Sequence, residues 1–533
     1  MCGIVGILLA DTDAHCRQEL FDALTVLQHR GQDAAGMVTS RTTEGNTKLN
    51  LYKGLGMVRD VFQQENMLSL EGNSGIGHCR YPTAGGACNN ETQPMYNNYP
   101  CGLAFAHNGN LTNTAEIRDH LSNQHRHLNT GSDSEALLNM FAEELRKEID
   151  ARQGDRSEKI KPESIFNAVR STIGLCRGGY SVVMLIHDVG VVAFRDPWGI
   201  RPLVMGKRDS RTLDKGMDYI FSSESVVSDT LGFELVRDIR PGECVLAIPM
   251  VPGAPREDFG FISEMVSNTS YDLTPCLFEY VYFSRPDSVM NGISVYEARL
   301  NMGKKLAEKI RRLYPDEHID VVIPIPDTSR TSALALAGAI GLPYREGFIK
   351  NRYIGRTFIM PEQTTRRKSV RLKLNTVKAE FEGRNVLLVD DSIVRGTTSQ
   401  ELVDMARDAG AKKVFFCSAA PEVRHPNVYG IDLPSAVELV AHNRTVEQIA
   451  EKIKADWVIF QDLDALEESV RSLNPEIKHF ETSTFTGTYV TNDVNEEYFA
   501  SLANERNDKA KVERQKSGKL SASEVPSANP VKA

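Results

Sequence analysis

Cys2 is the first residue whose type and position suggest chemistry, because it directly follows Met1. Removal of Met1 would leave a free α-amino group beside the thiol. Near neutral pH a thiol of pKa about 8.5 is only slightly ionised, whereas an α-amine of pKa about 7.7 to 8.0 can accept its proton. Cys2 and its own amine would then form a self-contained nucleophile. The alternative is a cysteine that packs as a small hydrophobic residue, and Cys2 alone leaves both interpretations open.

Four loop-like segments concentrate Gly, Asn, Arg and Asp where packing does not require them. They are Gln28–Gly36, Gly77–Gly85, His107–Asn113 and Gly131–Glu135. Each alone is compatible with an ordinary turn. Together with Cys2, in this order, they resemble the class II glutamine amidotransferases, which carry an N-terminal nucleophile, and the resemblance covers nearly all of the first 240 residues.

The resemblance implies that Cys2 attacks the side-chain amide of glutamine. A γ-glutamyl thioester and ammonia would form, and hydrolysis would then release glutamate. The family's Asn-Gly pair falls on Asn108 and Gly109. The side-chain amide of Asn108 and the backbone N–H of Gly109 would form the oxyanion hole, where loss of one donor typically lowers the rate ~100- to 1,000-fold.

Glutamine also carries an α-carboxylate and an α-ammonium group that must be held. The family's positions for these contacts fall on Arg80 and Asp133, and Arg suits a bidentate carboxylate contact. Arg30 and Thr83 match positions that support the same glutamine pocket. For Arg30 a purely structural ion pair is the alternative.

A second group of candidate residues follows the apolar run that begins at Val386. Two acids, Asp390 and Asp391, can bind sugar hydroxyls or a hard cation. The hydroxyls and backbone N–H groups from Ser392 to Thr398 can surround a phosphate at a helix N-terminus, and Gly396 allows close approach. An acidic helix start with an ordinary cap is the alternative for a bare Asp-Asp-Ser.

The full run resembles the phosphoribosyl diphosphate (PRPP) signature of type I phosphoribosyltransferases, and the chain has no Walker loop and no G-x-G-x-x-G. The resemblance assigns PRPP binding to Asp390, Asp391, Ser392, Ile393, Val394, Arg395, Gly396, Thr397 and Thr398. It implies Mg²⁺ as cofactor, with Asp390, Asp391 and Thr328 near the ion. Thr328 is equally compatible with a cap on a helix that begins near Ser329.

Between residues 350 and 373 the chain has eight basic residues and one acid, Glu362. A nucleic-acid patch is disfavoured because interleaved aromatic residues are few and the chain is acidic overall. The family's flexible loop matches 350–359, and its candidate residues here are Lys350, Arg352, Tyr353 and Arg356. We expect this loop to order over PRPP and to exclude water.

Hydrophobic spacing predicts the elements that must position these residues. In the N-terminal half, β-rich runs such as Ser181–Ile186 and Gly190–Phe194 and helices over 17–29 and 134–147 favour layered sheets. The C-terminal half has the strand, loop, helix, strand order of parallel βαβ units. A capping box, Thr398–Glu401, is expected to open one of its helices. Its predicted elements are 320–326, 329–340, 342–349, 384–389, 398–409 and 414–419.

The domain boundaries follow from the same patterns. Residues 2–245 form the predicted amidotransferase domain and 273–500 the phosphoribosyltransferase domain. Residues 246–272 are the predicted linker, because Ile248–Pro255 contains three prolines and a glycine. From 504 to 533 there is no aromatic residue and no Ile, so a disordered polar tail is expected.

Composition narrows the class of protein. The 533 residues are 41% hydrophobic and 25% charged, which is typical of a globular protein of several domains. A net charge of −9 argues against nucleic acid as a partner, and no run reaches the ~18 apolar residues of a membrane helix. Nine widely spaced cysteines without a C-x-x-C disfavour disulfide scaffolds and zinc ribbons, and a reducing cytoplasm is the predicted location.

The two halves together resemble the amidophosphoribosyltransferase family over residues 2–500. The resemblance implies an α/β and α+β protein of two domains, a four-layer αββα N-terminal-nucleophile hydrolase fold and a parallel-sheet type I phosphoribosyltransferase fold. It also implies that PRPP, glutamine and water give 5-phosphoribosylamine, glutamate and diphosphate, the first committed step of purine synthesis, with ammonia passing internally.

The sequence offers three alternatives to an amidophosphoribosyltransferase. Class II amidotransferases that make aminosugars or asparagine have other second domains, and the loop Val389–Thr398 excludes both. A catalytically inactive regulatory protein that binds PRPP or nucleotides is the third, and the presence of Cys2, Asn108 and Asp133 argues against it.

The resemblance further implies inhibition by purine nucleotides and assembly into a homo-oligomer, a dimer or a tetramer. Some members hold a [4Fe–4S] cluster through cysteines that include a late C-x-x-C. The last cysteine of this chain is Cys417, so no iron–sulfur cluster is predicted.

Overall fold

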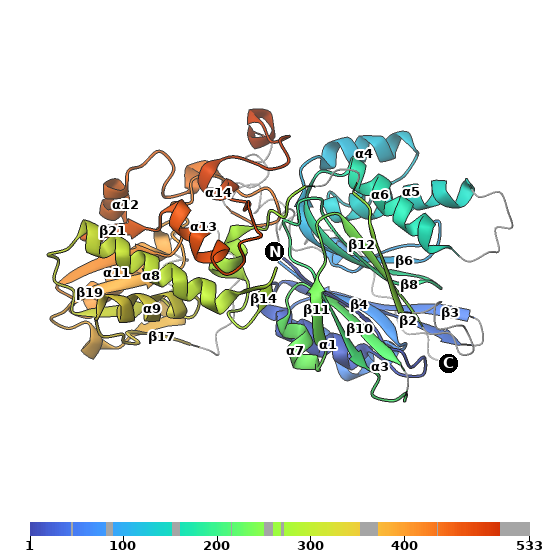
Figure 1. Cartoon of the computed structure of the whole chain (residues 1–533), viewed down its shortest axis with the longest axis horizontal. Helices are drawn as coiled ribbons and strands as arrows, with labels where there is room; N and C mark the ends of the chain where they lie inside the picture. The colour runs from blue at the N-terminus through green and yellow to red at the C-terminus, as the bar shows by residue number, and fades with distance from the viewer. Residues whose placement is uncertain are drawn as a thin grey trace, which may run out of the picture.

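Two antiparallel sheets lie face to face in the N-terminal half of the chain (Figure 1). The computed structural model describes residues 1–43, 46–81, 89–151, 160–214, 216–249, 260–267, 271–351, 371–433 and 435–500. The first sheet runs β11 (Glu234–Asp238), β9 (Val204–Asp209), β10 (Met217–Ser222), β1 (Gly3–Leu8), β4 (Ser74–Arg80), β2 (Ala34–Thr43) and β3 (Asn46–Leu55). The second runs β13 (Gly260–Met265), β12 (Glu243–Ile248), β8 (Gly190–Arg195), β7 (Gly178–Ile186), β6 (Leu103–Leu111) and β5 (Met95–Asn97).

Apolar side chains between the two sheets form one core. Ile4 and Leu8 of β1 and Ile76 of β4 pack with Val183 and Val191 of the second sheet. All six residues of β1 are buried, because this central strand is covered on both faces.

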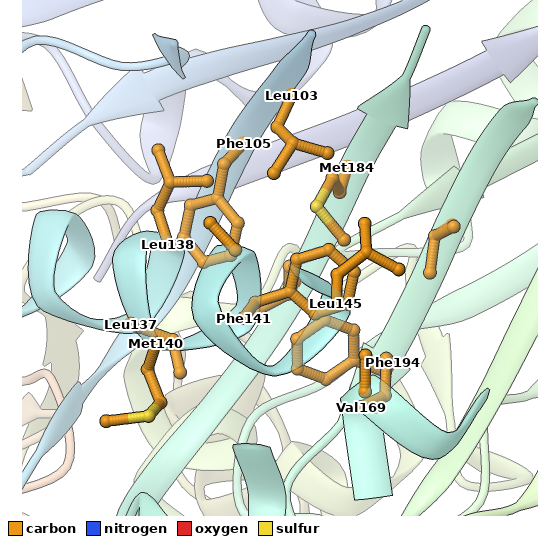
Figure 2. Close-up of a cluster of buried hydrophobic side chains, with 14 of the residues drawn as sticks. Leu103, Phe105, Leu137, Leu138, Met140, Phe141, Leu145, Val169, Met184 and Phe194 are labelled. Carbon is orange, nitrogen blue, oxygen red and sulfur yellow. The ribbon is translucent and has the colours of Figure 1, made fainter. Parts of the chain in front are cut away.

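Helices cover the outer face of each sheet. The first sheet packs against α1 (Arg17–Val26) and α7 (Val226–Leu231), and the second against α5 (Asp133–Asp150) and α6 (Pro162–Leu175). Figure 2 shows Phe105 and Phe194 of the second sheet against Phe141 and Leu145 of α5. The layer order α, β, β, α confirms the predicted fold. The shorter elements are η1 (Leu27–His29), α2 (Val58–Val61), α3 (Gln64–Ser69), η2 (Asn89–Glu91) and α4 (Thr114–Asn123).

A parallel sheet forms the centre of the second domain, as predicted. Its order is β16 (Val321–Pro324), β19 (Asn385–Asp390), β20 (Lys413–Ser418) and β21 (Trp457–Phe460). One face packs against α8 (Val295–Leu313) and α9 (Arg330–Ile340), and the other against α11 (Thr397–Asp408) and α12 (Val446–Ile453). The remaining elements are η4 (Glu279–Phe283), β14 (Val289–Met290), β15 (Ile293–Ser294), β17 (Phe348–Lys350), β18 (Leu374–Thr376), η5 (Lys378–Glu380), η6 (Ala436–Glu438), α13 (Leu463–Arg471) and α14 (Ser483–Thr486).

Local sequence signals account for several helix ends. The side chain of Ser132 accepts the N–H of Ser134 and so caps α5, within the segment predicted to open that helix. Gly341, with φ +77°, ends α9 as its position predicted. The predicted helix over 17–29 forms α1 and then tightens into the 3₁₀ turn η1.

The prediction of a linker over 246–272 is wrong for residues 260–267, which the structure describes as part of a sheet. Strand β13 lies in it and pairs with β12, with Leu246 opposite Ile262. The proline-containing segment therefore connects two neighbouring strands of one sheet rather than two domains. The first domain extends through β13, and the tail predicted from 504 onward lies outside the described residues.

The predicted capping box at Thr398–Glu401 is also wrong. Helix α11 begins one residue earlier, after Gly396, whose φ of +76° turns the chain into the helix without a side-chain cap. Thr398 therefore lies inside the first turn. Glu401 forms an ion pair with Arg371 instead.

Candidate active sites

Cys2 lies where strands from both sheets of the first domain come together. It immediately precedes β1, beside the end of β4, because Gly3 pairs with Cys79. The backbone N–H of Cys2 donates to Oδ1 of Asn108 at 2.9 Å, and Cys2 Sγ lies 3.7 Å from the carbonyl oxygen of Tyr81. Residues 106 positions apart are thus brought into direct contact, as the proposed nucleophile and oxyanion hole require.

The Asn108 side chain has an unused donor. Its Oδ1 accepts from Cys2, and among the described residues no acceptor reaches its fully buried Nδ2. A buried donor without a partner costs about 1 to 3 kcal/mol, so it needs an explanation. A developing oxyanion on a substrate bound at Cys2 would supply the missing acceptor.

Gly109 continues the same strand in a conformation that other residues rarely adopt. Its φ is +148°, and a Cβ atom there would lie 2.1 Å from the carbonyl oxygen of Gly179. Only glycine fits this backbone. The sequence pattern Asn-Gly therefore corresponds to a real geometric requirement at β6.

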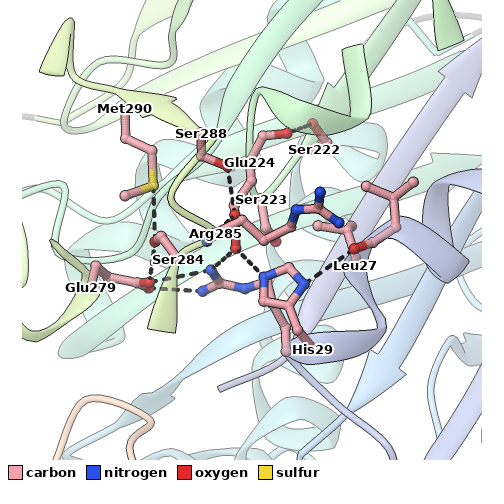
Figure 3. A network of polar contacts seen from close by, with 12 residues as sticks. Leu27, His29, Ser222, Ser223, Glu224, Glu279, Ser284, Arg285, Ser288 and Met290 are labelled. Atoms are coloured by element: carbon pink, nitrogen blue, oxygen red, sulfur yellow. Dashed lines mark hydrogen bonds and ion pairs between the residues drawn. The ribbon is translucent and has the colours of Figure 1, made fainter. Parts of the chain in front are cut away.

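Arg30 contacts Cys2 but is occupied by carboxylates. Its Nε donates to Cys2 O at 3.1 Å, its Nη1 to Glu224 Oε1 at 2.5 Å, and its Nη2 to Glu279 Oε1 at 2.8 Å. Burial lowers the pKa of Arg30, but Glu279 and Glu224 outweigh this and raise it. Of the two interpretations of Arg30, these contacts favour the ion pair. Figure 3 shows the network with His29, Glu224 and Glu279 labelled.

Two of the candidate glutamine-binding residues, Arg80 and Asp133, are each held by a neighbouring group. Arg80 ends β4, beside Cys2, and its Nη2 lies 2.5 Å from Glu91 Oε2. Asp133 begins α5, where its Oδ2 accepts the N–H of Leu111 at 3.1 Å. The carboxylate of Asp133 is thus held near the end of the strand that carries Gly109. Thr83 lies outside the described residues.

Met1 occupies a buried place next to Cys2. Its side chain packs with Ile200 and Leu277. Burial lowers the pKa of the Met1 amine to about 5. The Met1 amine is therefore largely uncharged at neutral pH, because charging it would cost desolvation energy.

The two acids of the second domain lie where β19 ends. Asp391 accepts hydrogen bonds from the hydroxyls of Thr328 and, at 2.7 Å, Ser392. The backbone N–H of Asp391 donates to Asp390 Oδ1 at 2.9 Å. Burial raises the pKa of both Asp390 and Asp391. The N-cap residue of α9 is Ser329, and the hydroxyl of Thr328 donates to Asp391 instead. Thr328 therefore faces the acids and does not cap the helix.

The loop after the acids presents backbone donors. Within the described part of the chain, no acceptor is hydrogen-bonded to the backbone N–H groups from Ser392 to Thr398. They surround the positive end of α11, an arrangement that binds phosphate. A Cβ atom on Gly396 would lie 2.8 Å from Val440 Cγ2, so a larger residue would disturb the loop.

Three residues of this loop have side chains that contact other parts of the domain. Ile393 is buried in the core beneath the sheet, and Val394 packs partly buried against a neighbouring cluster. Arg395 Nη1 lies 2.6 Å from Glu438 Oε1. These three residues can therefore reach a phosphate through their backbone N–H groups, while their side chains hold the loop in place.

The basic segment starts from a two-stranded ribbon. Strands β17 and β18 pair antiparallel, and Lys350 Nζ lies 2.8 Å from Asp327 Oδ2, next to Thr328. Lys350 thus lies at the same edge as the acids. Arg352, Tyr353 and Arg356 lie outside the described residues.

Sequence reasoning missed three acids of the sites. Glu91 pairs with Arg80, and Glu224 and Glu279 pair with Arg30. None stands in a recognisable motif, and the two partners of Arg30 are 194 and 249 positions away from it. A fully buried arginine requires such partners, but the sequence does not say which acids they are.

Comparisons with known proteins identify the families of both domains. Residues 82–226 match the family described as glutamine amidotransferase domain, and residues 294–427 match the phosphoribosyl transferase domain. Within the described residues, no helix is long and apolar enough to cross a membrane.

Full-length relatives share one name. The amidophosphoribosyltransferases of Escherichia coli and Pasteurella multocida are 54% and 52% identical, over 97% of this chain and 98% of each relative. A solved structure of the PRPP amidotransferase of Bacillus subtilis, complexed with ADP and GMP, has a TM-score of 0.77 at 34% identity. It covers 93% of this chain and 98% of that one. The chain belongs to the amidophosphoribosyltransferase family.

Proposed function

We propose that this chain transfers the amide nitrogen of glutamine to PRPP and so forms 5-phosphoribosylamine, glutamate and diphosphate in the first step of purine synthesis. The observation that carries the proposal is the pairing of Cys2 with Asn108 in a chain that also has the Asp390–Thr398 loop. The names of the full-length relatives support the same reaction.

The glutamine half-reaction begins at Cys2 after removal of Met1. The α-amine takes the thiol proton, and Sγ bonds to the amide carbon of glutamine. Charge develops on the amide oxygen, where Nδ2 of Asn108 and the N–H of Gly109 stabilise it. The C–N bond then breaks and ammonia leaves with the proton. Water hydrolyses the thioester to glutamate.

Glutamine is held at its α-carbon end while this occurs. Arg80 binds the α-carboxylate and Asp133 the α-ammonium, with Thr83 supporting the pocket. Both charged side chains are already fixed by neighbours, Arg80 by Glu91 and Asp133 by the N–H of Leu111. This preorganisation lowers the entropy cost of positioning the amide at Cys2.

The second half-reaction takes place at the edge of the parallel sheet. Ammonia passes inside the protein to C1 of PRPP, the C1–O bond to diphosphate breaks, and a C–N bond forms. The backbone N–H groups from Ser392 to Thr398 bind a phosphate of PRPP, and the carboxylates of Asp390 and Asp391 accept from ribose hydroxyls.

Magnesium fits the donors present at this edge. No group of three His, Cys, Asp or Glu side chains in the described ranges could hold a metal ion, but Mg²⁺ is commonly bound by one or two carboxylates together with substrate phosphates. Asp390 and Asp391, with the Thr328 hydroxyl beside them, would hold it. When bound, Mg²⁺ would neutralise charge on the diphosphate leaving group.

Further properties of the family extend the proposal. The segment that begins at Lys350 closes over PRPP and excludes water. Purine nucleotides inhibit the enzyme, which the ADP and GMP in the Bacillus subtilis structure support. The enzyme is a cytoplasmic homo-oligomer, and it holds no iron–sulfur cluster.

Product release tests the proposal directly. Purified protein is given glutamine, PRPP and Mg²⁺, and glutamate and diphosphate are measured, with ammonium replacing glutamine in a parallel assay. We expect equal amounts of the two products. Cys2→Ala should abolish the glutamine reaction and spare the ammonium reaction, whereas Cys101→Ala, a partly buried cysteine away from the site, should change neither. Diphosphate release from neither nitrogen source would contradict the proposal.

A further inference from the structure

One segment of the second domain, residues 419–431, connects the PRPP edge to the glutaminase strand β6. At its start, the N–H groups of Ala419 and Ala420 donate to the carbonyl oxygens of Asp390 and Asp391, both at 2.9 Å. Near its end, Asn110 Nδ2 donates to the carbonyl oxygen of Val428 at 3.0 Å. The same short segment therefore contacts both the PRPP edge and the strand that carries Asn108 and Gly109.

Two glycines, Gly430 and Gly109, bring the backbones of the two domains close together at this place. Gly430 has φ +102°, and a Cβ atom there would lie 2.9 Å from both Cα and C of Gly109 and 3.0 Å from its oxygen. Real Cβ atoms essentially never lie closer than 3.0 Å to a heavy atom of another residue that is distant in the chain. If Gly430 carried a Cβ atom, either Gly430 or Gly109 would therefore have to move. The atoms in contact are backbone atoms, which cannot rotate away as a flexible side chain can.

Gly109 also lies close to strand β7. A Cβ atom on Gly109 would lie 2.1 Å from the carbonyl oxygen of Gly179, which shows how closely β7 approaches. Gly179 in turn faces Tyr429, since a Cβ atom on Gly179 would lie 3.0 Å from Tyr429 Cβ. Neighbouring backbone positions of β6 and β7, Gly109 and Gly179, therefore both lie against the 419–431 segment.

The 419–431 segment is itself fixed at this point. Asn427 Oδ1 accepts the N–H groups of Tyr429, at 2.8 Å, and Ile431, at 3.0 Å. The hydroxyl of Tyr429 lies 2.9 Å from Thr491 Oγ1 and accepts the N–H of Thr491 at 3.1 Å. A side chain added at Gly430 would therefore displace Gly109 rather than the segment.

We infer that Gly430 is a positioning residue for the glutaminase reaction, through which the phosphoribosyltransferase domain completes the oxyanion hole of the other domain. This inference rests on the proposed function. The N–H of Gly109 acts only when charge develops on the amide oxygen, so its displacement weakens transition-state binding more than glutamine binding. The kcat of the glutamine reaction should fall, while the KM for glutamine and the ammonium reaction should change little.

The test compares Gly430→Ala with Gly383→Ala in the full-length protein. Gly383 also has a positive φ, +73°, but no atom lies within 4 Å of its Cβ position, so it controls for backbone strain alone. For Gly430→Ala we expect kcat with glutamine to fall about 10- to 100-fold, somewhat less than the loss of a whole oxyanion donor. The KM for glutamine and the ammonium-dependent rate should stay within about twofold, and Gly383→Ala should match wild type in all three values.

Two outcomes would overturn the inference: an unchanged kcat with glutamine, or an equal loss of the glutamine and ammonium reactions. If Gly430→Ala does not yield folded protein, Tyr429→Phe carries the test, because it removes both contacts with Thr491 and leaves Gly430 in place. A selective loss of the glutamine rate supports the inference, and a wild-type rate refutes it. A wild-type protein inactive with both nitrogen sources would refute the proposed function instead.

Discussion

Arg30 of the first domain and Glu279 of the second form a buried ion pair, with Arg30 Nη2 2.8 Å from Glu279 Oε1 and side-chain exposures of 0% and 3%. Arg30 also donates to the carbonyl oxygen of Cys2. The main chain of the nucleophile is thus tied to the second domain through one arginine. Several measurable consequences follow from this and from the geometry of the two sites.

Breaking the Arg30–Glu279 pair should weaken both stability and glutaminase activity. Glu279→Gln leaves a buried arginine with incomplete charge compensation, which should lower the free energy of unfolding by about 3 kcal/mol. Urea-induced unfolding measures this change. Asp287→Asn is the control. The side chains of Asp287 and its partner Arg285 are 50% and 40% exposed, so their ion pair should contribute at most about 1 kcal/mol to the free energy of unfolding. Equal effects of the two substitutions would contradict the prediction.

The Glu224 carboxylate predicts a pH dependence of stability. Burial alone would raise the pKa of the Glu224 carboxyl. The contacts with His29 and Arg30 lower this pKa by more than burial raises it, so the folded value lies well below the ordinary 4.5. The unfolded chain therefore binds a proton first as the pH falls. The stabilising contribution of Glu224 should be complete above about pH 5 and shrink steadily below pH 4.5.

Melting temperatures of wild type and Glu224→Gln from pH 3 to pH 8 check this sign. The difference between the two proteins should narrow as the pH falls below about 4.5, because the unfolded chain then binds the proton first. A difference that widens as the pH falls would mean that the folded carboxylate has a raised pKa, contrary to its contacts with Arg30 and His29.

Loss of the Asn108 amide should remove one oxyanion donor. Asn108→Ala should lower kcat with glutamine about 100- to 1,000-fold, because Nδ2 has no other partner in the described part of the chain. The ammonium-dependent rate should be preserved. Asn97→Ala, which removes a half-buried amide bonded to Asn139, is the control and should leave both rates near wild type. A glutamine rate within tenfold of wild type would count against the assignment.

The acids of the second domain should matter for both nitrogen sources. Asp391→Asn keeps the shape of the side chain but removes its charge, so diphosphate release should fall at least about 100-fold with glutamine and with ammonium alike. Asp404→Asn, on α11 and partly buried in a pair with Lys454, should have no such effect. A selective loss with glutamine alone would place Asp391 in the wrong half-reaction.

Local sequence was sufficient for several elements whose residues are neighbours in the chain, although not for the start of α11. The run from Val386 to Thr398 predicted a strand, two acids and a phosphate-binding turn, because strand, loop and helix start are continuous in the chain. The same holds for the cap at Ser132 and the stop at Gly341. Cys2 became a candidate nucleophile from its position after Met1, but only the four further motifs favoured that interpretation over a packed cysteine.

Tertiary structure decided which distant residues meet. Strand register brings Asn108 to Cys2 and leaves its Nδ2 without a partner. The sequence left Arg30 between substrate pocket and ion pair, and only the approach of Glu279 from the other domain favours the pair. Gly430 carries no motif, and its close approach to Gly109 exists only when the domains pack. Such contacts depend on the summed packing of many elements, which local propensity does not encode.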